Sequence, residues 1–506
     1  MQEESFRSRY FIKILSSIMI AVLNIVIQML LPRALSVEEF GYYSYNLNIF
    51  TSVVSLANLS TSNALVAKFA KRNDEIGLIY FYLKFYLIEI IFLSISLTVL
   101  YPTDFAKNSF AGQTISMVIL GLETSAVTKF LTDVISIYDS MAIAKISALF
   151  QIILKVIICI FTAILYFLGK FDLAIFYCGQ VVFTFFIALM LLRIILKYQR
   201  KRYPVVKSES FKIYFKEYLI FCRPLIISSI VSQIIIILMN WCLMRFSGAT
   251  EQAMFGAAWQ LNSLLTFIFA PYAELSKREY SIISNNNNEL KVFYESSLRR
   301  MFWLTAYFAC FIGFCSDWIL RIVYGDKYIG ANIVTLFIMI YTIYQAWGQM
   351  AGAFMLATEK TRMNAILGII GQIITIILVF IFQIPNIIWP AGLGAIGIAL
   401  VYVWGNIINV CISVGVTART LGMNVIKTLF IQIPPMVLCS IMAFILNIIM
   451  NNLFIENTML FSLLKLFIAG VIYTIIIVLT IWMHPSFISM NKGQLKKLLL
   501  IKLNKK

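Results

Sequence analysis

Five charged residues interrupt long apolar stretches in the first third of the chain. They are Glu89, Glu123, Lys129, Asp133 and Lys155. A charged side chain at the centre of a spanning helix costs about 2.5–3.5 kcal/mol when it faces lipid, so it is expected to face an aqueous cavity or a partner of opposite charge. A lysine in this position is suited to bind an anionic group, because charge-assisted hydrogen bonds to phosphate-type oxygens are strong. These five residues are therefore candidates for lining a path through an apolar layer.

Two of these candidates allow a different interpretation. Lys129 and Asp133 are four residues apart, so on a helix they share one face and can form a local ion pair. Lys155 has no acidic neighbour within its own helix. At about 1.5 Å per residue, both lysines lie roughly 15–20 Å from the polar turns beside their helices. We expect Lys155 to line a cavity, and the alternative is that it pairs with Glu123 or Asp133.

A sequence repeat places two further cations. Residues 31–44 and 243–256 each lie between apolar runs and share a Leu-x-Arg and a Phe-Gly pair, the latter at an offset three residues larger. A repeat after about 210 residues indicates two homologous halves, and transporters built in this way hold their substrate path between the halves. Arg33 and Arg245, the arginines of the repeat, are predicted to lie at outer helix ends. Contact with lipid headgroups fits that position as well as contact with a substrate does.

The apolar runs define the fold class. Of the 506 residues, 61% are hydrophobic and 13% are charged, which is typical of an integral membrane protein. A spanning helix needs about 20 apolar residues. We predict an all-α membrane protein with fourteen spans, near residues 11–32, 42–67, 78–101, 111–138, 142–168, 171–196, 219–244, 252–276, 298–324, 331–357, 361–383, 392–416, 427–450 and 459–483.

The repeat divides these spans into six, six and two. Residues 1–196 are predicted to form an N-terminal six-helix bundle, 197–218 a cytoplasmic linker, 219–416 a second six-helix bundle, 417–484 two additional helices and 485–506 a basic cytoplasmic tail. Within the linker, aromatic residues recur at helical spacing over residues 211–218 with lysines between them. This pattern predicts an amphipathic helix that lies in the membrane interface.

The net charge of +18 reflects topology and not nucleic-acid binding. With a cytoplasmic N-terminus, the inner segments hold 31 of the 41 Lys and Arg residues and the outer turns hold six. This asymmetry follows the positive-inside rule and places both termini in the cytoplasm. The remaining four fall within apolar runs, and one of them, Lys465, can extend its amine to the membrane surface.

The sequence argues against catalysis. His484 is the only histidine, which excludes His-based metal clusters and leaves no place for a His-dependent triad. The eight cysteines lie in or beside apolar runs and are expected to be buried thiols. The outer loops are short, which disfavours a membrane glycosyltransferase or polysaccharide polymerase. We expect no cofactor and no metal.

Several motifs resemble those of one transporter family. The first is Leu31-Pro-Arg-Ala-Leu-Ser-Val-Glu-Glu-Phe-Gly-Tyr-Tyr-Ser44, and the others are Arg223-Pro-Leu, Tyr324-Gly-x-x-Tyr328 and Leu356-Ala-Thr-Glu-Lys360. With them the chain is similar, over about residues 10–480, to the Wzx-type O-antigen and polysaccharide flippases. These proteins belong to the multidrug/oligosaccharidyl-lipid/polysaccharide superfamily.

The resemblance implies a fold and an activity. The fold would be two six-helix bundles around a central cavity, with two additional helices. The activity would be to flip undecaprenyl-pyrophosphate-linked oligosaccharide, an O-antigen or capsule repeat unit, from the cytoplasmic to the outer leaflet of the bacterial inner membrane by alternating access. Membrane lipids, a polysaccharide polymerase and chain-length machinery would be partners.

Two alternatives to this activity remain open. A cation-coupled multidrug antiporter of the same superfamily would need an acidic, aromatic cavity to bind organic cations. The buried lysines disfavour this alternative. A membrane polysaccharide polymerase or glycosyltransferase is the enzyme alternative. Many relatives of the flippases carry an Asp at the end of the seventh helix where this chain has Asn240-Trp241, so coupling to an ion gradient is open too.

Overall fold

The computed structural model describes residues 6–489 except 73, 142, 204–208, 285, 389–391, 432 and 457. Residues 490–506 of the predicted tail and 204–208 of the predicted linker lie outside the described residues. The chain divides into two compact units, Met1–Gly256 and Ala257–Lys506, and each is described by itself. Every regular element in the described part of the chain is a helix, so the prediction of an all-α protein is confirmed.

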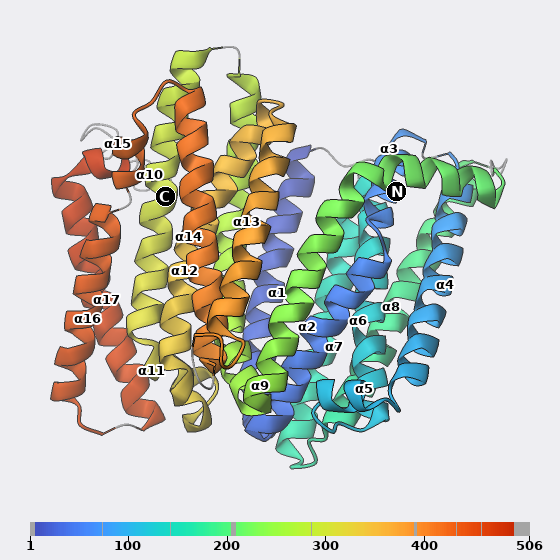
Figure 1. The fold of residues 1–506 in the computed structure, drawn as a ribbon, viewed down its shortest axis with the longest axis horizontal. Coiled ribbons are helices and arrows are strands. Elements are labelled where there is room, and N and C mark those ends of the chain that lie inside the picture. Colours follow the sequence, from blue (N-terminus) through green and yellow to red (C-terminus); the bar gives the residue numbers. More distant parts are fainter. Residues whose placement is uncertain are drawn as a thin grey trace, which may run out of the picture. The chain divides into compact units, whose positions relative to one another are not determined.

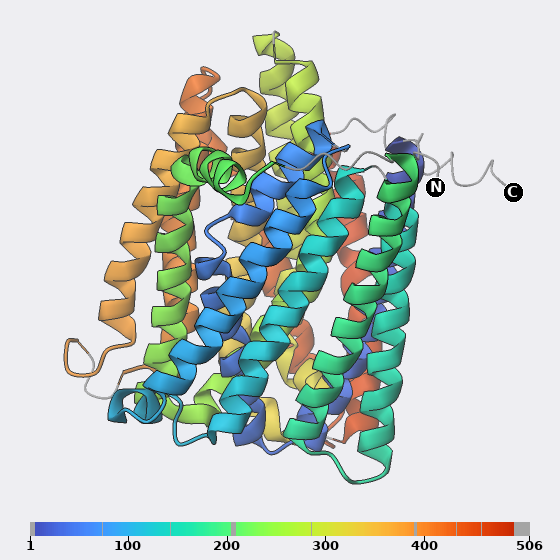
Figure 2. The same ribbon diagram turned by 90° about the vertical axis from the view of Figure 1, so that its right-hand side faces the viewer.

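The first unit contains nine helices in its described residues, the last of which continues into the second unit (Figure 1). They are α1 (Phe6–Ala34), α2 (Val37–Ala57), α3 (Thr61–Lys71), α4 (Gly77–Leu100), α5 (Asp104–Ser109), α6 (Ile115–Ser140), α7 (Ala144–Phe167), α8 (Leu173–Arg202) and α9 (Phe211–Ile282). Figure 2 shows the long helices of this unit running side by side. Within the unit, α6 packs on α2 and α8, and α7 packs on α1.

The second unit follows the same plan of long helices joined by short turns. Its helices after α9 are α10 (Asn287–Phe314), α11 (Ser316–Val323), α12 (Asn332–Ala357), α13 (Thr361–Phe382), α14 (Gly394–Thr420), α15 (Val425–Phe430), α16 (Ile433–Leu453) and α17 (Met459–Met483), with the short 3₁₀ helices η1 (Asp326–Ala331) and η2 (Pro485–Ile488). Helix α12 is central to this unit, because it packs against α10 and α14.

The predicted spans all have a helical counterpart. Eleven described helices are long and apolar enough to cross a membrane, and the number rises to thirteen if the bent pairs α2–α3 (59°) and α10–α11 (76°) are each counted as one span. Helix α9 contains 72 residues and would be about 110 Å long if straight, several times the ~30 Å thickness of the hydrocarbon layer. Its non-helical residue, Gly248, separates the seventh predicted span from the eighth.

The connection between the first two spans is shorter than the sequence predicted. Helix α1 continues through Pro32 and Arg33, and α2 begins at Val37. Ser36 explains the sharp restart, because its Oγ accepts a hydrogen bond from the Glu39 backbone (3.2 Å) and the Glu39 carboxylate accepts one from the Ser36 backbone (2.9 Å). This reciprocal capping satisfies two amide groups at the start of α2.

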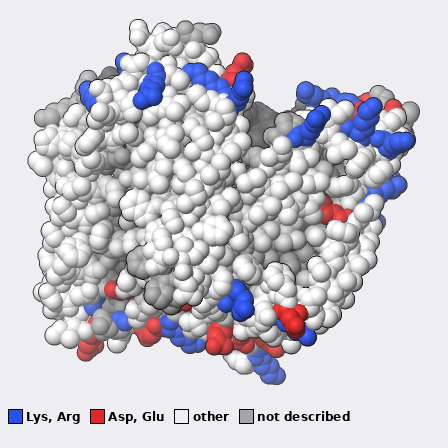
Figure 3. Space-filling model, viewed as in Figure 1, with Lys and Arg blue, Asp and Glu red and all other residues white. Residues whose placement is uncertain are grey.

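The outer surface of each unit is apolar. In the first unit Phe92 and Val99 are exposed, and in the second unit Phe467 and Ile475 are exposed. Figure 3 shows that the charged side chains of each unit gather towards its two ends and leave a wide band with few charges between them. Extensive exposed apolar surface of this kind marks contact with lipid. The chain is a multi-pass membrane protein.

Two glycines of the sequence repeat allow α2 and α9 to approach closely. A Cβ atom at Gly41 would lie 2.0 Å from the backbone oxygen of Ala249, and one at Gly256 would lie 2.4 Å from Ser44 Oγ. The repeated Phe-Gly pair therefore marks the two points where the first copy of the repeat packs against the second. Only glycine fits at Gly41, because the opposing atom belongs to the backbone and cannot rotate away.

We predict that Gly41→Ala destabilises the protein by about 1–3 kcal/mol, the usual cost of overpacking a tight contact. The measurement is thermal unfolding of the purified protein in detergent. Gly368→Ala in α13 is the matched control, because a Cβ there meets no atom within 4 Å and alanine favours a helix. Equal melting temperatures for the two variants would contradict the close contact at Gly41.

The first turns of α9, where the sequence predicts an amphipathic helix, pack on other helices of the first unit. In Figure 1 they run across the ends of the neighbouring helices. Tyr214 is buried and donates a hydrogen bond from its hydroxyl to Glu75 Oε1 (2.6 Å). The Glu217 carboxylate accepts hydrogen bonds from Arg72 (2.7 Å) and Lys68 (3.1 Å). The aromatic residues predicted to face the membrane are thus divided, with Tyr214 buried and Phe215 exposed.

The contact at Glu217 predicts how docking depends on pH. The hydrogen bond from Arg72, opposed in part by burial and aided by Lys68, lowers the pKa of Glu217 below its ordinary value. Because the pKa of Glu217 is lowered in the docked state, the contact stabilises docking at pH values above the pKa of a free glutamate, about 4.3. The contact is lost only as the pH falls through the lower pKa that Glu217 has in the docked state.

We predict that a fluorescent label at Phe215, introduced as Phe215→Cys in a cysteine-free background, reports a docked helix down to about pH 4.3. Glu217→Gln should undock the helix at neutral pH. An unchanged signal in that variant would show that other contacts, such as the hydrogen bond from Tyr214 to Glu75, are enough to hold it.

Candidate functional site

Three of the five predicted charges meet in one buried network. Glu89 lies on α4, Lys129 and Asp133 lie on α6, and the corner between α2 and α3 faces them. The other members of the network are polar residues of these elements. We call this six-residue set the corner network: Asn58, Ser62, Tyr82, Glu89, Lys129 and Asp133.

Asn58 connects the helix break to the acids. Leu59 and Ser60 follow it with φ values of 48° and 63°, a left-handed conformation that side chains other than glycine rarely adopt. The Asn58 side-chain oxygen accepts hydrogen bonds from the backbone N–H (3.2 Å) and the hydroxyl (3.0 Å) of Ser62 in the first turn of α3. Its NH₂ group donates to the Tyr82 hydroxyl (3.2 Å) and to Glu89 Oε2 (3.5 Å). One amide therefore caps α3 and contacts α4.

The ion pair that the sequence allowed between Lys129 and Asp133 is present. Lys129 Nζ lies 2.7 Å from Asp133 Oδ1 and donates a second hydrogen bond to Ser62 Oγ (3.0 Å). The other oxygen of Asp133 accepts a hydrogen bond from Tyr82 (2.5 Å). Both oxygens of this carboxylate, whose side chain is 3% exposed, have partners. A role for Lys129 and Asp133 in a substrate path remains a prediction.

Lys155 stands apart from this network. It is partly buried in α7 and forms no hydrogen bond or ion pair with the described residues, so the structure contains no ion pair to Glu123 or Asp133. At 100° per residue, it lies on the half of the helix that faces away from lipid. The exposed face of α7 is formed by Leu149, Ile153, Val156 and Ile160.

Lys155 and the corner network share a depth. Glu89, Lys129 and Lys155 each lie about 16–18 Å along the axis from the same end of their helices, the ends at Gly77, Ser140 and Ala144. That distance is about half of the ~30 Å hydrocarbon thickness. Glu123, on α6, lies nearer the other end and forms no hydrogen bond or ion pair with described residues. The first unit thus carries cations and acids at the middle of its spans.

The remaining predicted cations occupy the ends of helices. Arg33 is in the last turn of α1 and is partly buried. Arg245 is exposed on α9, shortly before Gly248. Lys465 could extend its amine to the membrane surface but is buried instead. It is 1% exposed and donates a hydrogen bond to Asn451 Oδ1 (3.2 Å), because a polar residue of α16 is within reach and the amine need not extend to the surface.

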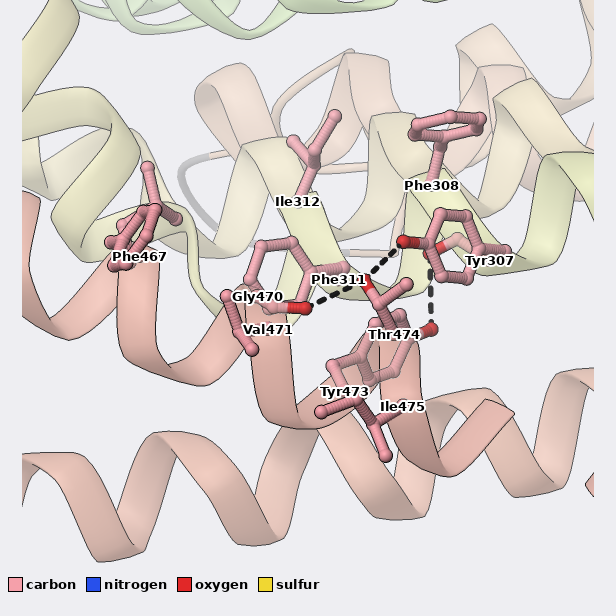
Figure 4. Close-up of a pocket in the computed structure, with 11 residues that line it drawn as sticks. Tyr307, Phe308, Phe311, Ile312, Phe467, Gly470, Val471, Tyr473, Thr474 and Ile475 are labelled. Carbon is pink, nitrogen blue, oxygen red and sulfur yellow. Dashed lines mark hydrogen bonds between the residues drawn. The ribbon is translucent and has the colours of Figure 1, made fainter. Parts of the chain in front are cut away.

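The second unit contains an aromatic cluster of its own. Trp259 on α9, Tyr341 on α12 and Tyr402 on α14 form a partly buried cluster with ring centroids 4.7–5.7 Å apart. On the same unit an apolar groove of about 490 Å³ lies between α10 and α17. Figure 4 shows Tyr307 and Thr474 meeting across this groove, where their hydroxyls form a hydrogen bond of 2.7 Å. No charged residue lines the groove, so it does not suit an anionic group.

Asn58, Ser62 and Tyr82 are functional candidates that sequence reasoning missed. The signal available was the polar run from Asn58 to Asn63 within the second apolar stretch. No group of three or more potential metal-ligating His, Cys, Asp or Glu side chains occurs in the described part of the chain.

We predict that Asp133→Asn destabilises the protein by about 2–3 kcal/mol. Removing one partner of a buried ion pair leaves the other charge uncompensated, and the cost is below the fully buried value because Lys129 is 22% exposed. Thermal unfolding in detergent measures the effect. Glu123→Gln on the same helix is the control and should change stability by less than about 0.5 kcal/mol. The double variant Asp133→Asn with Lys129→Met should recover part of the loss. A double variant less stable than Asp133→Asn would contradict the ion pair.

Comparison with known proteins adds a family and a fold. A profile of the family described as "polysaccharide biosynthesis protein" matches residues 8–276. The chain is similar in structure to a lipid II flippase, MurJ, in an inward closed conformation, with a TM-score of 0.70 and 16% identity over 92% of this chain and 98% of that one. No curated protein matches in sequence.

The fold is also that of multidrug transporters. An inward-facing multidrug resistance MATE family transporter of the MOP superfamily matches with a TM-score of 0.62 and 15% identity, over 80% of this chain and 95% of that one. An outward-facing one matches with a TM-score of 0.55 and 15% identity, over 81% and 94%. The predicted transporter fold is confirmed. Proteins with this fold include both a flippase and drug transporters, so the fold alone does not choose between the two activities.

Proposed function

Because the chain belongs to the polysaccharide biosynthesis protein family, we propose that it flips undecaprenyl-pyrophosphate-linked oligosaccharide, an O-antigen or capsule repeat unit, from the cytoplasmic to the outer leaflet of the bacterial inner membrane. The protein acts by alternating access, without a cofactor and without altering its substrate covalently. Both termini are cytoplasmic. A polysaccharide polymerase and chain-length machinery receive the flipped product. The similarity in fold to a lipid II flippase supports this class of cargo.

The observation that carries the proposal is the environment of Lys155. This cation lies halfway along a spanning helix, on the half that faces away from lipid, and has no ion-pair partner among the described residues. A structural lysine at that depth would be expected to have an acidic partner, as Lys129 has. An unpaired one is suited to receive an anionic headgroup such as pyrophosphate, for which it supplies charge and hydrogen-bond donors.

The aromatic cluster of the second unit fits an oligosaccharide. The faces of Trp259, Tyr341 and Tyr402 are large apolar surfaces with a polar edge, and such faces pack against the apolar faces of sugar rings. We propose that these residues contact the glycan. Arg33 and Arg245 are proposed to contact the headgroup at the outer ends of their helices.

One observation favours the multidrug antiporter as the second candidate. Glu123 is a partly buried acid of a spanning helix without an ion-pair partner among the described residues, and aromatic rings bind organic cations through their faces. An antiporter would use Glu123 and the aromatic cluster, and Lys155 would repel its cargo. Lys155 would therefore attract the anionic cargo of a flippase and repel the cationic cargo of an antiporter.

We predict that Lys155→Glu abolishes flipping of lipid-linked oligosaccharide by the protein reconstituted in vesicles, and that Lys155→Arg largely retains it. At about 4 Å and an effective dielectric constant near 20, one repulsion between the new carboxylate and pyrophosphate is worth roughly 4 kcal/mol, or about a thousandfold in affinity. The measurement is the fraction of lipid that an added glycan-modifying enzyme can reach. The modified lipid should be otherwise intact.

The neutral variants Lys155→Gln and Lys84→Gln form a matched pair. Lys84 also lies in a spanning helix of the first unit, but its side chain is exposed, so Lys84→Gln should flip lipid at the normal rate. The double variant Lys155→Glu with Glu123→Lys should stay inactive. Restored flipping in this charge swap would show a structural ion pair and refute the role of Lys155. Faster export of an organic cation by Lys155→Gln, with flipping unchanged, would favour the antiporter.

A further inference from the structure

Glu89 is the acid of the corner network that lacks a full set of partners. It is 6% exposed, and its Oε2 accepts one long hydrogen bond, 3.5 Å, from Asn58. Its other oxygen, Oε1, is buried without any hydrogen-bond partner. Burying an ionised carboxylate costs free energy when one of its oxygens lacks a hydrogen bond. Such a carboxylate in a protein usually takes up a proton and becomes neutral.

The donors around Glu89 are already committed. From α4, Tyr82 donates its hydroxyl proton to Asp133, and Tyr86 donates its own to the backbone oxygen of Ala126 (2.6 Å). From α6, Lys129 is bound to Asp133 and Ser62. The α2–α3 corner contributes Asn58 and Ser62, which carry no charge. No hydroxyl or ammonium group of the network is therefore directed at Glu89.

The charges of the network give the same result. Asp133 and Lys129 are the charged groups that act on Glu89, and they neutralise each other in their ion pair. An ionised Glu89 leaves the network with a net charge of −1, and a proton on Glu89 brings it to zero. An uncompensated charge in the apolar part of a membrane protein is costly, and where one occurs it usually has a functional role.

Asn58 links the charge on Glu89 to the backbone. Its NH₂ group is the donor to Glu89, and its oxygen caps the first turn of α3. A hydrogen bond to an ionised acceptor is stronger than one to a neutral acceptor. The same residue precedes Leu59 and Ser60, whose left-handed conformations set the 59° bend between α2 and α3. Each such conformation costs about 1–3 kcal/mol and persists only while its surroundings hold it.

We propose that Glu89 is a proton-binding site and that the proton it binds controls the bend between α2 and α3. When Glu89 is ionised, it draws the Asn58 amide towards α4 and holds the corner. When Glu89 takes a proton from water, this hydrogen bond weakens, and the strained corner is free to change its angle. The proposal does not depend on which cargo the protein moves, so it can be tested without a transport assay.

A metal cation is the competing ligand. Hard cations such as Na⁺ or Ca²⁺ are bound by several oxygen atoms at once. In the corner network, Glu89 Oε1 is the carboxylate oxygen without a partner, whereas both oxygens of Asp133 and the Asn58 oxygen are occupied. One bare oxygen suits a proton and falls short of a metal site. Sodium therefore serves as a control ligand in the test.

The first experiment is infrared difference spectroscopy of the full-length protein in vesicles, between about pH 9 and about pH 5. The wild type should gain the carbonyl band of a protonated acid in an apolar environment. Glu89→Gln should lack that band, and Glu289→Gln, which removes an exposed acid of α10, should retain it. A band that persists in Glu89→Gln, or a wild type without one, overturns the proposal.

The second experiment measures the corner itself. Spin labels at Lys71→Cys on α3 and Lys84→Cys on α4, both exposed positions, should show a distance that changes with pH in the wild type. Glu89→Gln mimics the protonated acid, so it should give the low-pH distance at both pH values. If that variant fails to fold, Glu89→Asp keeps an acid and should keep the pH response. A distance independent of pH, or a change produced by sodium at constant pH, contradicts the proposal.

Discussion

The amide of Asn58 is the contact on which the candidate site depends. In a hydrocarbon layer, water does not replace a missing hydrogen bond, so every break in a spanning helix must be satisfied by protein groups. Asn58 meets this requirement by capping α3 with its oxygen while its NH₂ group binds Tyr82 and Glu89. The break in the helix and the buried acid are therefore parts of one structure, and the state of one affects the other.

Lys129 and Lys155 lie at the same depth but have different surroundings, so we assign them different roles. Lys129 is held by Asp133 and Ser62, so most of its charge is used within the protein. Lys155 has no such partner among the described residues. An unpaired charge is expensive in an apolar environment, and the proposed function gives this lysine an anionic partner in the cargo. We therefore propose that Lys155 contacts the substrate and that the corner network responds to protons.

The residues of the sequence repeat also take part in helix packing. The Phe-Gly pair of each copy places a glycine where the opposing helix comes very close, Gly41 against the backbone of Ala249 and Gly256 against the side chain of Ser44. A helix pair that packs backbone to backbone buries little side-chain surface and relies on shape. The contact at Gly41 has no room for even one methyl group, because the opposing atom belongs to the backbone.

The sequence by itself determined the all-α membrane fold, the positions of the long apolar helices and the repeat. These features depend on the length of apolar runs and on helical rise, which are local properties of the chain. It also identified Lys129 and Asp133 as a possible pair, because four residues make one helical turn.

Only the tertiary structure decided which polar groups meet. Asn58, Tyr82 and Glu89 are far from Asp133 in the chain, and their contacts arise from the packing of α2, α3, α4 and α6. The bend after Asn58 and the burial of Lys465 were likewise hidden, because neither follows from hydropathy. Hydrogen bonds between residues distant in sequence depend on the angles and distances between helices, and no local pattern encodes those angles.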